Sequence, residues 1–332
     1  MSPSGSPADP ARVLHVNDCA FTTTHLLTEA DRRGLPWSYQ PLAAPPQDWS
    51  GVGAQARRAA LGARWVTALA TRAARVDLLH VHSGTVVAHT RLVPRRFVLH
   101  LHGSDVRSML YRPEHRATLL WGLRHAAAVL YSTPDLAEHA LPHRPDARLL
   151  PVPLPVASLP TWAPGDRPRV VFASRWEAVK GLDTQLEVAA GLRRALGADV
   201  ELVGLDWGEG ADQARAAGVR LVPRCTHPEF LALLAGAHVV VGQSSGMLAA
   251  SELEAIGIGV PVVAALNPSW YPDRAPVLGG READSMVAAV VDALADPVAR
   301  SAELGGRAWL TTHHDVGRAV DTLTALYERL TR

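Results

Sequence analysis

Short apolar runs alternate with helical patterns along the chain. The runs at 12–16 (RVLHV), 77–82 (DLLHVH) and 97–101 (FVLHL) contain little strict alternation of polar and apolar positions. Strands that are buried on both faces have this continuous pattern, and they occur in parallel sheets covered by helices. The stretches at 22–33 and 54–74 have helical spacing. The first half of the chain therefore predicts an α/β domain with a parallel sheet.

The composition changes sharply between positions 151 and 168. Six prolines fall in this segment, at 151, 153, 155, 160, 164 and 168, and proline fixes φ and removes a backbone donor. We therefore expect an interdomain linker here. The βα alternation then restarts, with strands expected at 169–173, 200–203, 219–222, 238–241 and 260–264 and helices at 181–195, 211–217, 228–235 and 247–256.

The predicted fold class is α/β, with two doubly wound parallel-sheet (Rossmann-like) domains facing a cleft. We expect a disordered tail at 1–10, an N-terminal domain at 11–150, the Pro-rich linker at 151–168 and a C-terminal domain at 169–312. A C-terminal helix at 313–332 is expected to pack back on the N-terminal domain.

Charge and cysteine content exclude several classes of protein. Lysine and arginine number 33 against 32 acidic residues, a net charge of +1, whereas a nucleic-acid-binding protein normally has a basic surplus or stripe. The two cysteines are far apart and lack CxxC spacing, which excludes a disulfide scaffold and a cysteine zinc site. No apolar run reaches the ~18 residues of a membrane span. With no signal-like start, we expect a cytoplasmic protein.

Two cations in the second half are placed to bind an anion. Arg175 lies just past a predicted strand, and Lys180 lies at the entry to the following helix. Open α/β sheets bind ligands beyond the carboxyl ends of their strands, and two fixed cations beside a helix N-terminus suit a diphosphate. The alternative is that both residues are solvated in a surface loop.

A second candidate segment begins with Ser244, Ser245 and Gly246. These residues precede a predicted helix, whose first amides are then expected to be free for an anion. Glu252 and Glu254 are two positions apart, so on a helix they face different directions. A buried carboxylate needs hydrogen-bond partners, which ribose hydroxyls would supply. The alternative is that both are ordinary surface glutamates.

Two His-x-His pairs support a rival hypothesis. His80 and His82 form one pair, and His100 and His102 form the other. Each pair lies on one side of a strand, and imidazole is the commonest metal ligand, so a metal hydrolase is an alternative. The (β/α)₈ barrel of amidohydrolase-type enzymes has no proline-rich break, however. Another alternative is that His80, His82 and His100 are simply partly buried and hydrogen-bonded. No GxGxxG follows a strand, which disfavours an NAD-dependent dehydrogenase.

Together these segments resemble the retaining family-4 glycosyltransferases of the GT-B fold. The family pairs an Arg…Lys-Gly phosphate clamp with a Glu-Ala-Met-Ala-x-Gly-x-Pro-Val-Val segment. The corresponding segments here are Arg175 with Lys180-Gly181, 254–263 (EAIGIGVPVV), 202–204 (LVG), 77–82 (DLLHVH, for DxxHxH) and 102–105 (HGSD). The resemblance extends from Arg12 to the C-terminal helix ending in ALYERL.

The resemblance implies a hexosyl/glycosyltransferase that uses a nucleoside-diphosphate-sugar donor without a cofactor. Arg175 and Lys180 would stabilise the departing diphosphate, Glu254 would bind the ribose, and His102 would contact the transferred sugar. The residues expected to be catalytic are therefore His102, Arg175 and Lys180. The donor loop comprises Gly246, Met247 and Leu248. No DxD motif is present to hold a metal. The acceptor, a small molecule or glycan, would bind in the first domain near Asn17, Asp18, His82 and Asp105.

The chain departs from the family pattern at three places. Gly246 stands where the family has a glutamate that helps to hold the donor sugar, so Gln243 or backbone amides are expected to substitute. Ser174 replaces a glycine before the clamp arginine, and 17–20 (NDCA) replaces a Gly-rich turn. The departure at Gly246 motivates one more hypothesis, a nucleotide-sugar-binding protein without turnover.

Overall fold

The structure is a computed structural model that describes residues 9–42 and 53–332. The predicted tail at 1–10 lies mostly outside the described residues. The chain divides into two compact units. Unit 1 comprises Met1–Pro153 and Val316–Arg332, and unit 2 comprises Leu154–Asp315. The first boundary falls near the start of the predicted linker, so that 154–168 belongs to unit 2.

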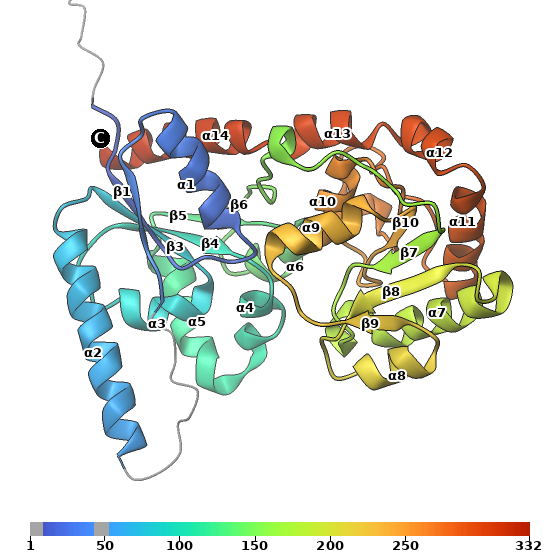
Figure 1. Cartoon of the computed structure of the whole chain (residues 1–332). Coiled ribbons are helices and arrows are strands. Elements are labelled where there is room, and N and C mark those ends of the chain that lie inside the picture. The colour runs from blue at the N-terminus through green and yellow to red at the C-terminus, as the bar shows by residue number, and fades with distance from the viewer. Residues whose placement is uncertain (1–8, 43–52) are drawn as a thin grey trace, which may run out of the picture. The chain divides into compact units, whose positions relative to one another are not determined.

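Unit 1 contains a six-stranded sheet in which every pair of neighbours is parallel. Its order is β2-β1-β3-β4-β5-β6 (Figure 1). The bounds are β1 (Val13–Val16), β2 (Trp37–Gln40), β3 (Leu78–His82), β4 (Phe97–Leu101), β5 (Ala128–Tyr131) and β6 (Arg148–Leu149). β1, β3 and β4 lie where continuous apolar runs predicted strands. β2 has the sequence WSYQ and is mostly half-buried, so its strand lacks that signal.

Helices cover both faces of this sheet. Apolar residues of α2 (Ala54–Ala73), α3 (Val87–Thr90) and α5 (Pro113–His125) pack on one face, in a core with Leu79 and Leu99. α1 (Thr22–Arg32) and α14 (Val316–Thr331) cover the other, where Leu26 and Leu323 contact the strands. The remaining short helices are α4 (Ser104–Arg107) and α6 (Ala137–Ala140).

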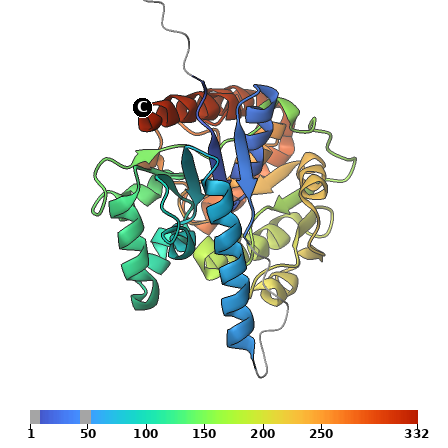
Figure 2. The ribbon, with the colours of Figure 1, turned by 90° about the vertical axis from the view of Figure 1, so that its left-hand side faces the viewer.

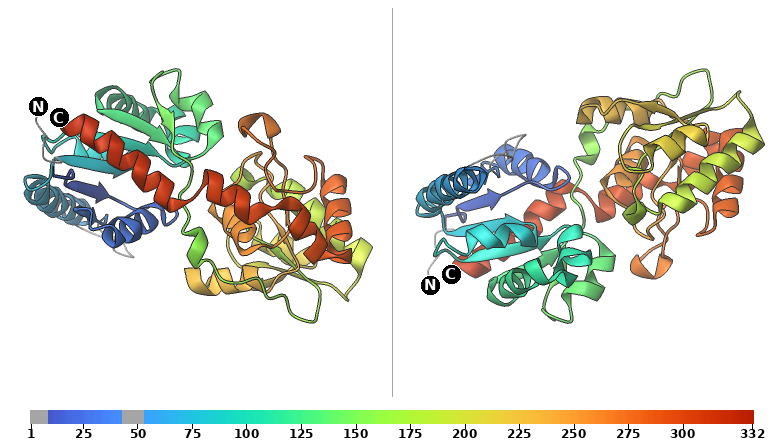
Figure 3. Two further views of the ribbon diagram at one scale, coloured as in Figure 1. Left: turned by 90° about the horizontal axis from the view of Figure 1, so that it is seen from above. Right: turned by 90° about the horizontal axis from the view of Figure 1, so that it is seen from below.

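The C-terminal helix α14 is part of the core of unit 1. Its buried residues are Val316, Ala319, Val320, Leu323, Leu326 and Tyr327, a spacing that places them on one helical face. They pack against Val13, Leu78 and Val98 on three adjacent strands. Figure 2 shows α14 beside α1, and Figure 3 shows it crossing the strands. Unit 1 is therefore completed by residues from the far end of the sequence.

Unit 2 contains a five-stranded parallel sheet with the order β11-β10-β7-β8-β9. The strands are β7 (Arg169–Phe172), β8 (Glu201–Leu205), β9 (Arg220–Val222), β10 (Val239–Val241) and β11 (Val262–Val263). The helices are α7 (Leu182–Leu196), α8 (Ala211–Ala216), α9 (His227–Ala235), α10 (Ala250–Ile258), α11 (Ala283–Ala295), α12 (Pro297–Leu304) and α13 (Gly306–His313). The Pro-rich segment is anchored to this unit, since Trp162 Nε1 donates to the Ala237 carbonyl at 2.8 Å.

The strand orders locate a topological switch point in each unit. β1 is flanked by β2 and β3, and β7 is flanked by β8 and β10. The chain connections therefore diverge between β1 and β3 in unit 1 and between β7 and β10 in unit 2. Ligands of open α/β sheets bind outside the carboxyl ends of the strands at such points.

None of the helices in the part of the chain that the structure describes combines the length and the apolar character needed to cross a membrane.

Candidate functional site

The two predicted cations of unit 2 lie at the switch point between β7 and β10. Arg175 follows β7, and Lys180 precedes α7. Lys180 Nζ donates to Gln243 Oε1 at 2.9 Å, and Gln243 is a fully buried residue that follows β10. Arg175 forms an ion pair with Glu177 at 3.0 Å and lies 5.0 Å from the ring centroid of Trp207. Lys180 thus bridges the two central strand ends, while Arg175 stays half exposed.

The backbone around Lys180 is in close contact with the loop that follows β10. The amide of Ser244 donates to the carbonyl of Lys180 at 3.0 Å. Gly181 has a φ of +74°, and a Cβ atom there would lie 2.7 Å from Ser244 Cβ. Because a side chain would push the two loops apart, glycine at this position holds them together.

This close contact makes a prediction about Gly181→Ala. Gly305, at the C-terminal end of α12, is also in the left-handed region, but a Cβ atom there meets nothing within 4 Å. Both alanine variants are expected to lose about 1–2 kcal/mol for left-handed backbone, and only Gly181→Ala displaces Ser244. Thermal unfolding should therefore show a larger loss for Gly181→Ala, and calorimetry should show weaker nucleotide binding for it alone. Equal behaviour of the two variants would contradict the close-contact argument.

The glutamates of α10 are both buried, so the interpretation that they are surface residues is wrong. Glu252 Oε1 accepts from the amide of Gln243, and its Oε2 accepts from the amide of Ala249, each at 2.9 Å. Glu254 lies with its Oε1 2.7 Å from Nε2 of His227. Glu252 therefore fixes the loop before α10, and Glu254 is the one that faces another polar side chain.

The loop between β10 and α10 differs from its expected form. α10 begins at Ala250, so the residues Ser244 to Gly246 do not form the start of the helix. The amide of Gly246 donates to the carbonyl of Ala265, and the amide of Leu248 donates to the Tyr271 hydroxyl at 2.8 Å. The expectation of free helix amides here is therefore wrong for these positions. Met247 is buried, and its carbonyl accepts from Gln243 Nε2 at 3.1 Å.

Gly246 also has a packing reason for lacking a side chain. Its φ is +88°, and a Cβ atom would lie 3.1 Å from Cζ3 of Trp270. A glutamate at this position would require the indole to move. Gln243, expected to substitute for that glutamate, uses its amide group on Lys180 and on the loop itself.

The switch point of unit 1 lies where β1 and β3 end. Asn17 follows β1 and donates from Nδ2 to the carbonyl of His82 at 2.9 Å. Asp18 accepts from the amide of Thr23 at 2.9 Å and from the hydroxyl of Thr24 at 2.6 Å, which holds the start of α1. The non-glycine residues with positive φ among those described all lie here: Asn17, Ala20, Phe21 and Ser83. Such conformations cost about 1–3 kcal/mol each and gather at functional sites.

Asp105 organises the loop that carries His102. Its buried carboxylate accepts from the backbone amides of Gly84, His102, Gly103 and Val106, at 2.8–3.3 Å. The residue is 2% exposed. The sequence predicted that Asp105 would lie on the acceptor side. In the structure its carboxylate oxygens bind backbone amides, so the residue orders the loop that carries His102.

Five histidines lie side by side across β1, β3 and β4. His15, His80, His82 and His100 are fully buried, and His102 is partly buried. Burial lowers the pKa of His15 to about 3 and that of His102 to about 4, and it lowers the pKa values of the other three well below the usual range. All five imidazoles are therefore neutral at pH 7. Sequence reasoning missed His15, whose only signal was its place in the RVLHV strand.

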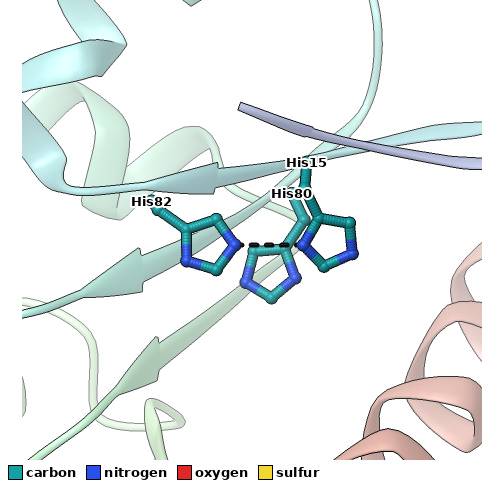
Figure 4. A group of neighbouring side chains, drawn as sticks. All are labelled: His15, His80 and His82. Carbon is teal, nitrogen blue, oxygen red and sulfur yellow. Dashed lines mark hydrogen bonds between the residues drawn. The ribbon is translucent and has the colours of Figure 1, made fainter. Parts of the chain in front are cut away.

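The rival metal hypothesis depends on how the ring nitrogens meet. His15, His80 and His82 offer nitrogens within 4.8 Å of one another, as do His82, His100 and His102 (Figure 4 shows the first group). Neutral imidazoles are suitable ligands for zinc. Neither group includes a carboxylate, so an ion in either group would be held by imidazoles alone.

Comparisons with known proteins give no match to a family profile and none to a curated protein sequence. Solved structures do match. HepE from Anabaena, solved with UDP and glucose, has a TM-score of 0.68 at 14% identity over 96% of this chain and 99% of its own. A variant of TarM from S. aureus, solved with UDP and α-GlcNAc-glycerol, has a TM-score of 0.64 at 15% identity over 81% of this chain and 58% of its own.

A third match is trehalose-6-phosphate synthase, studied for glycosyl transfer with retention. It has a TM-score of 0.66 at 11% identity, covering 96% of this chain and 99% of its own. At these identities the likeness shows the fold. This chain has two units, each built on a parallel sheet, as predicted for that fold. The chain has the GT-B fold predicted from its sequence.

Proposed function

We propose that this protein is a glycosyltransferase that moves a sugar from a nucleoside-diphosphate-sugar donor to an acceptor hydroxyl. In this proposal unit 2 binds the donor and unit 1 binds a small-molecule or glycan acceptor. The observation that carries the proposal is the Lys180–Gln243 hydrogen bond across the β7/β10 switch point, with Arg175 beside it. The matching structures of HepE and TarM were solved with UDP, which supports the same class of ligand.

The roles of the residues follow from their chemistry. Arg175 and Lys180 would stabilise negative charge on the departing diphosphate, the kind of electrostatic effect that usually dominates such steps. Glu254, held by His227, would accept hydrogen bonds from the ribose. His102 would contact the transferred sugar. The donor loop 246–248 would lie against the donor.

The proposed reaction retains the anomeric configuration. The bond from the anomeric carbon to the diphosphate oxygen breaks, a bond to the acceptor oxygen forms on the same face, and the acceptor proton passes to the departing diphosphate. No carboxylate is assigned as a covalent nucleophile. We further propose that the reaction needs no metal or other cofactor. It would take place in the cytoplasm, since two widely separated cysteines suit a reducing compartment.

The experiment that tests this proposal is a donor panel. Thermal shift is measured with nucleoside diphosphates and their sugars, where a ligand at 100 times its dissociation constant stabilises by ~2.7 kcal/mol. Positive donors are then incubated with candidate acceptors, and the products are analysed by mass spectrometry and by NMR of the anomeric proton. We expect transfer or donor hydrolysis, retained configuration, and unchanged activity in EDTA. Loss in EDTA with rescue by zinc would instead support the histidine metal enzyme.

A second candidate is a nucleotide-sugar-binding protein without turnover. It is favoured by Gly246, which stands where the family has a glutamate on the donor sugar, and where any side chain would require the indole of Trp270 to shift. Donor binding in the thermal-shift panel, without transfer or hydrolysis for any donor, would support this candidate over the enzyme.

A further inference from the structure

The buried histidines form a continuous row of ring contacts that ends on the C-terminal helix. His102 Nε2 lies 3.1 Å from His82 Nδ1, and His82 Nε2 lies 3.1 Å from His15 Nδ1 (the latter is dashed in Figure 4). His15 Nε2 then lies 3.5 Å from the hydroxyl of Tyr327. That hydroxyl is also in closer contact with His80 Nδ1. The row therefore connects the loop after β4 to α14 within unit 1.

Each hydrogen bond in this row constrains the next one. A neutral imidazole carries one N–H and one lone pair, so a ring that accepts at one nitrogen must donate from the other. His15 and His82 use both nitrogens within the row. The tautomers of His15, His82 and His102 must therefore all point the same way along it.

Tyr327 decides the direction because its hydroxyl has a single proton. A phenol is a stronger acid than an imidazole N–H, so the hydroxyl donates to its closer partner, His80 Nδ1. Its oxygen then accepts from Nε2–H of His15. It follows that His15 Nδ1 accepts from Nε2–H of His82, and that His82 Nδ1 accepts from Nε2–H of His102.

We propose that Tyr327, acting through His15 and His82, fixes His102 as the Nε2–H tautomer and leaves Nδ1 of His102 as a hydrogen-bond acceptor. The three residues are positioning residues, and His102 is the least buried member of the row. The use of this acceptor for a substrate hydroxyl rests on the proposed function; the tautomer itself does not. Reversing the row would turn the same nitrogen into a donor.

The contacts favour a hydrogen-bonded row over a metal in the same place. In each of the two histidine pairs the nitrogens lie 3.1 Å apart, which is hydrogen-bonding distance and requires one of them to carry a proton, whereas a metal would require both nitrogens of a pair to be without protons. His80 Nε2 and both nitrogens of His100 have no hydrogen-bond partner in the structure. These nitrogens have no competing hydrogen bond, although His80 and His100 belong to different candidate groups, and metal analysis is therefore part of the test.

The test is ¹⁵N NMR of the histidine side chains in the full-length protein at pH 7.5 without ligand. We expect pyridine-type Nδ1 and pyrrole-type Nε2 signals for His102, His82 and His15. In Tyr327→Phe, the His15 N–H loses its acceptor, so the His102 Nδ1 signal should move toward the average of both tautomers. Tyr111→Phe is the matched control, since Tyr111 also contacts a histidine, His139, outside the row. It should leave the His102 signals unchanged.

Three results would overturn the proposal. The first is a wild-type His102 that carries its proton on Nδ1. The second is a Tyr327→Phe variant that unfolds like the wild type and leaves the His102 signals unchanged. The third is a stoichiometric metal in the purified protein. If donor turnover is established, Tyr327→Phe should lower kcat/KM by about threefold to tenfold, the value of one weakened hydrogen bond. Failure of the donor panel would leave the NMR result valid, so the two hypotheses are tested separately.

Discussion

Removing the charge of Lys180 is expected to weaken nucleoside-diphosphate binding by roughly 1.5–3 kcal/mol, the range for charge-assisted hydrogen bonds. Lys180→Met keeps much of the aliphatic stem and removes only the ammonium group. Binding of the free nucleoside should change much less, because it has no phosphate to contact. Arg175→Ala removes a bidentate fork and should have an effect in the same range. Isothermal titration with the nucleoside and its diphosphate measures both ligands.

Glu254→Gln serves as the contrasting variant. The ribose is common to nucleoside and diphosphate, so this variant should weaken both ligands alike. If the cations act on the leaving diphosphate, their loss should also lower kcat as well as raise KM. The Lys180 variant also leaves the Gln243 side-chain oxygen without its Lys180 partner. Thermal unfolding of each variant therefore controls for a loss of stability. Equal losses for nucleoside and diphosphate in Lys180→Met would refute the assignment, as would a fully active variant lacking both cations.

The main features of the fold were predictable because buried parallel strands leave a strong pattern. Runs such as VLHV and FVLHL are fully buried strands in the structure. β2 escaped prediction because WSYQ is short, edge-placed and only partly buried. The boundary at Pro153 also differs from the composition signal. Proline content shows where regular structure stops, but it does not show to which unit the segment belongs, which depends on long-range contacts such as the Trp162–Ala237 hydrogen bond.

The candidate site was predictable in its position and not in its contacts. Arg175 and Lys180 could be placed beyond a strand because strand ends and helix starts are local signals. The partners Gln243 and His227 are 63 and 27 positions away from Lys180 and Glu254, and nothing in a single sequence pairs them. The buried state of Glu252 likewise depends on two backbone amides that only the folded loop brings together.

The histidine row shows the same limit for a larger group. His80, His82, His100 and His102 were visible as two pairs with strand spacing. These histidines contact His15 and Tyr327 only because the strands have the order β1-β3-β4 and because α14 packs onto the same sheet. Neither is encoded in a local pattern. The row is thus a product of topology, and it places all its imidazoles where charging them is costly.

Acidification from pH 7 to pH 5 is therefore expected to destabilise unit 1 strongly. In the folded protein, burial lowers the pKa of His15 to about 3 and that of His102 to about 4, compared with about 6.5 for an unfolded histidine. The nearby Asp18 and Asp105 only partly oppose the shift at His102. The unfolded chain then binds more protons than the folded chain, so stability is fully present above about pH 6.5 and is lost as pH falls toward the folded pKa values.

At pH 5 this linkage costs about 2 kcal/mol for each of these two residues, and His80, His82 and His100 act in the same direction. Hydrogen exchange followed by mass spectrometry should show β1, β3 and β4 losing protection before β7 and β10, and Tm should fall by roughly 10 °C or more. His100→Leu removes one buried imidazole whose nitrogens have no partner in the structure. It should reduce the loss between pH 7 and 5. Equal loss in the variant and wild type, or equal protection of both sheets at pH 5, would show that the row is not the acid-sensitive element.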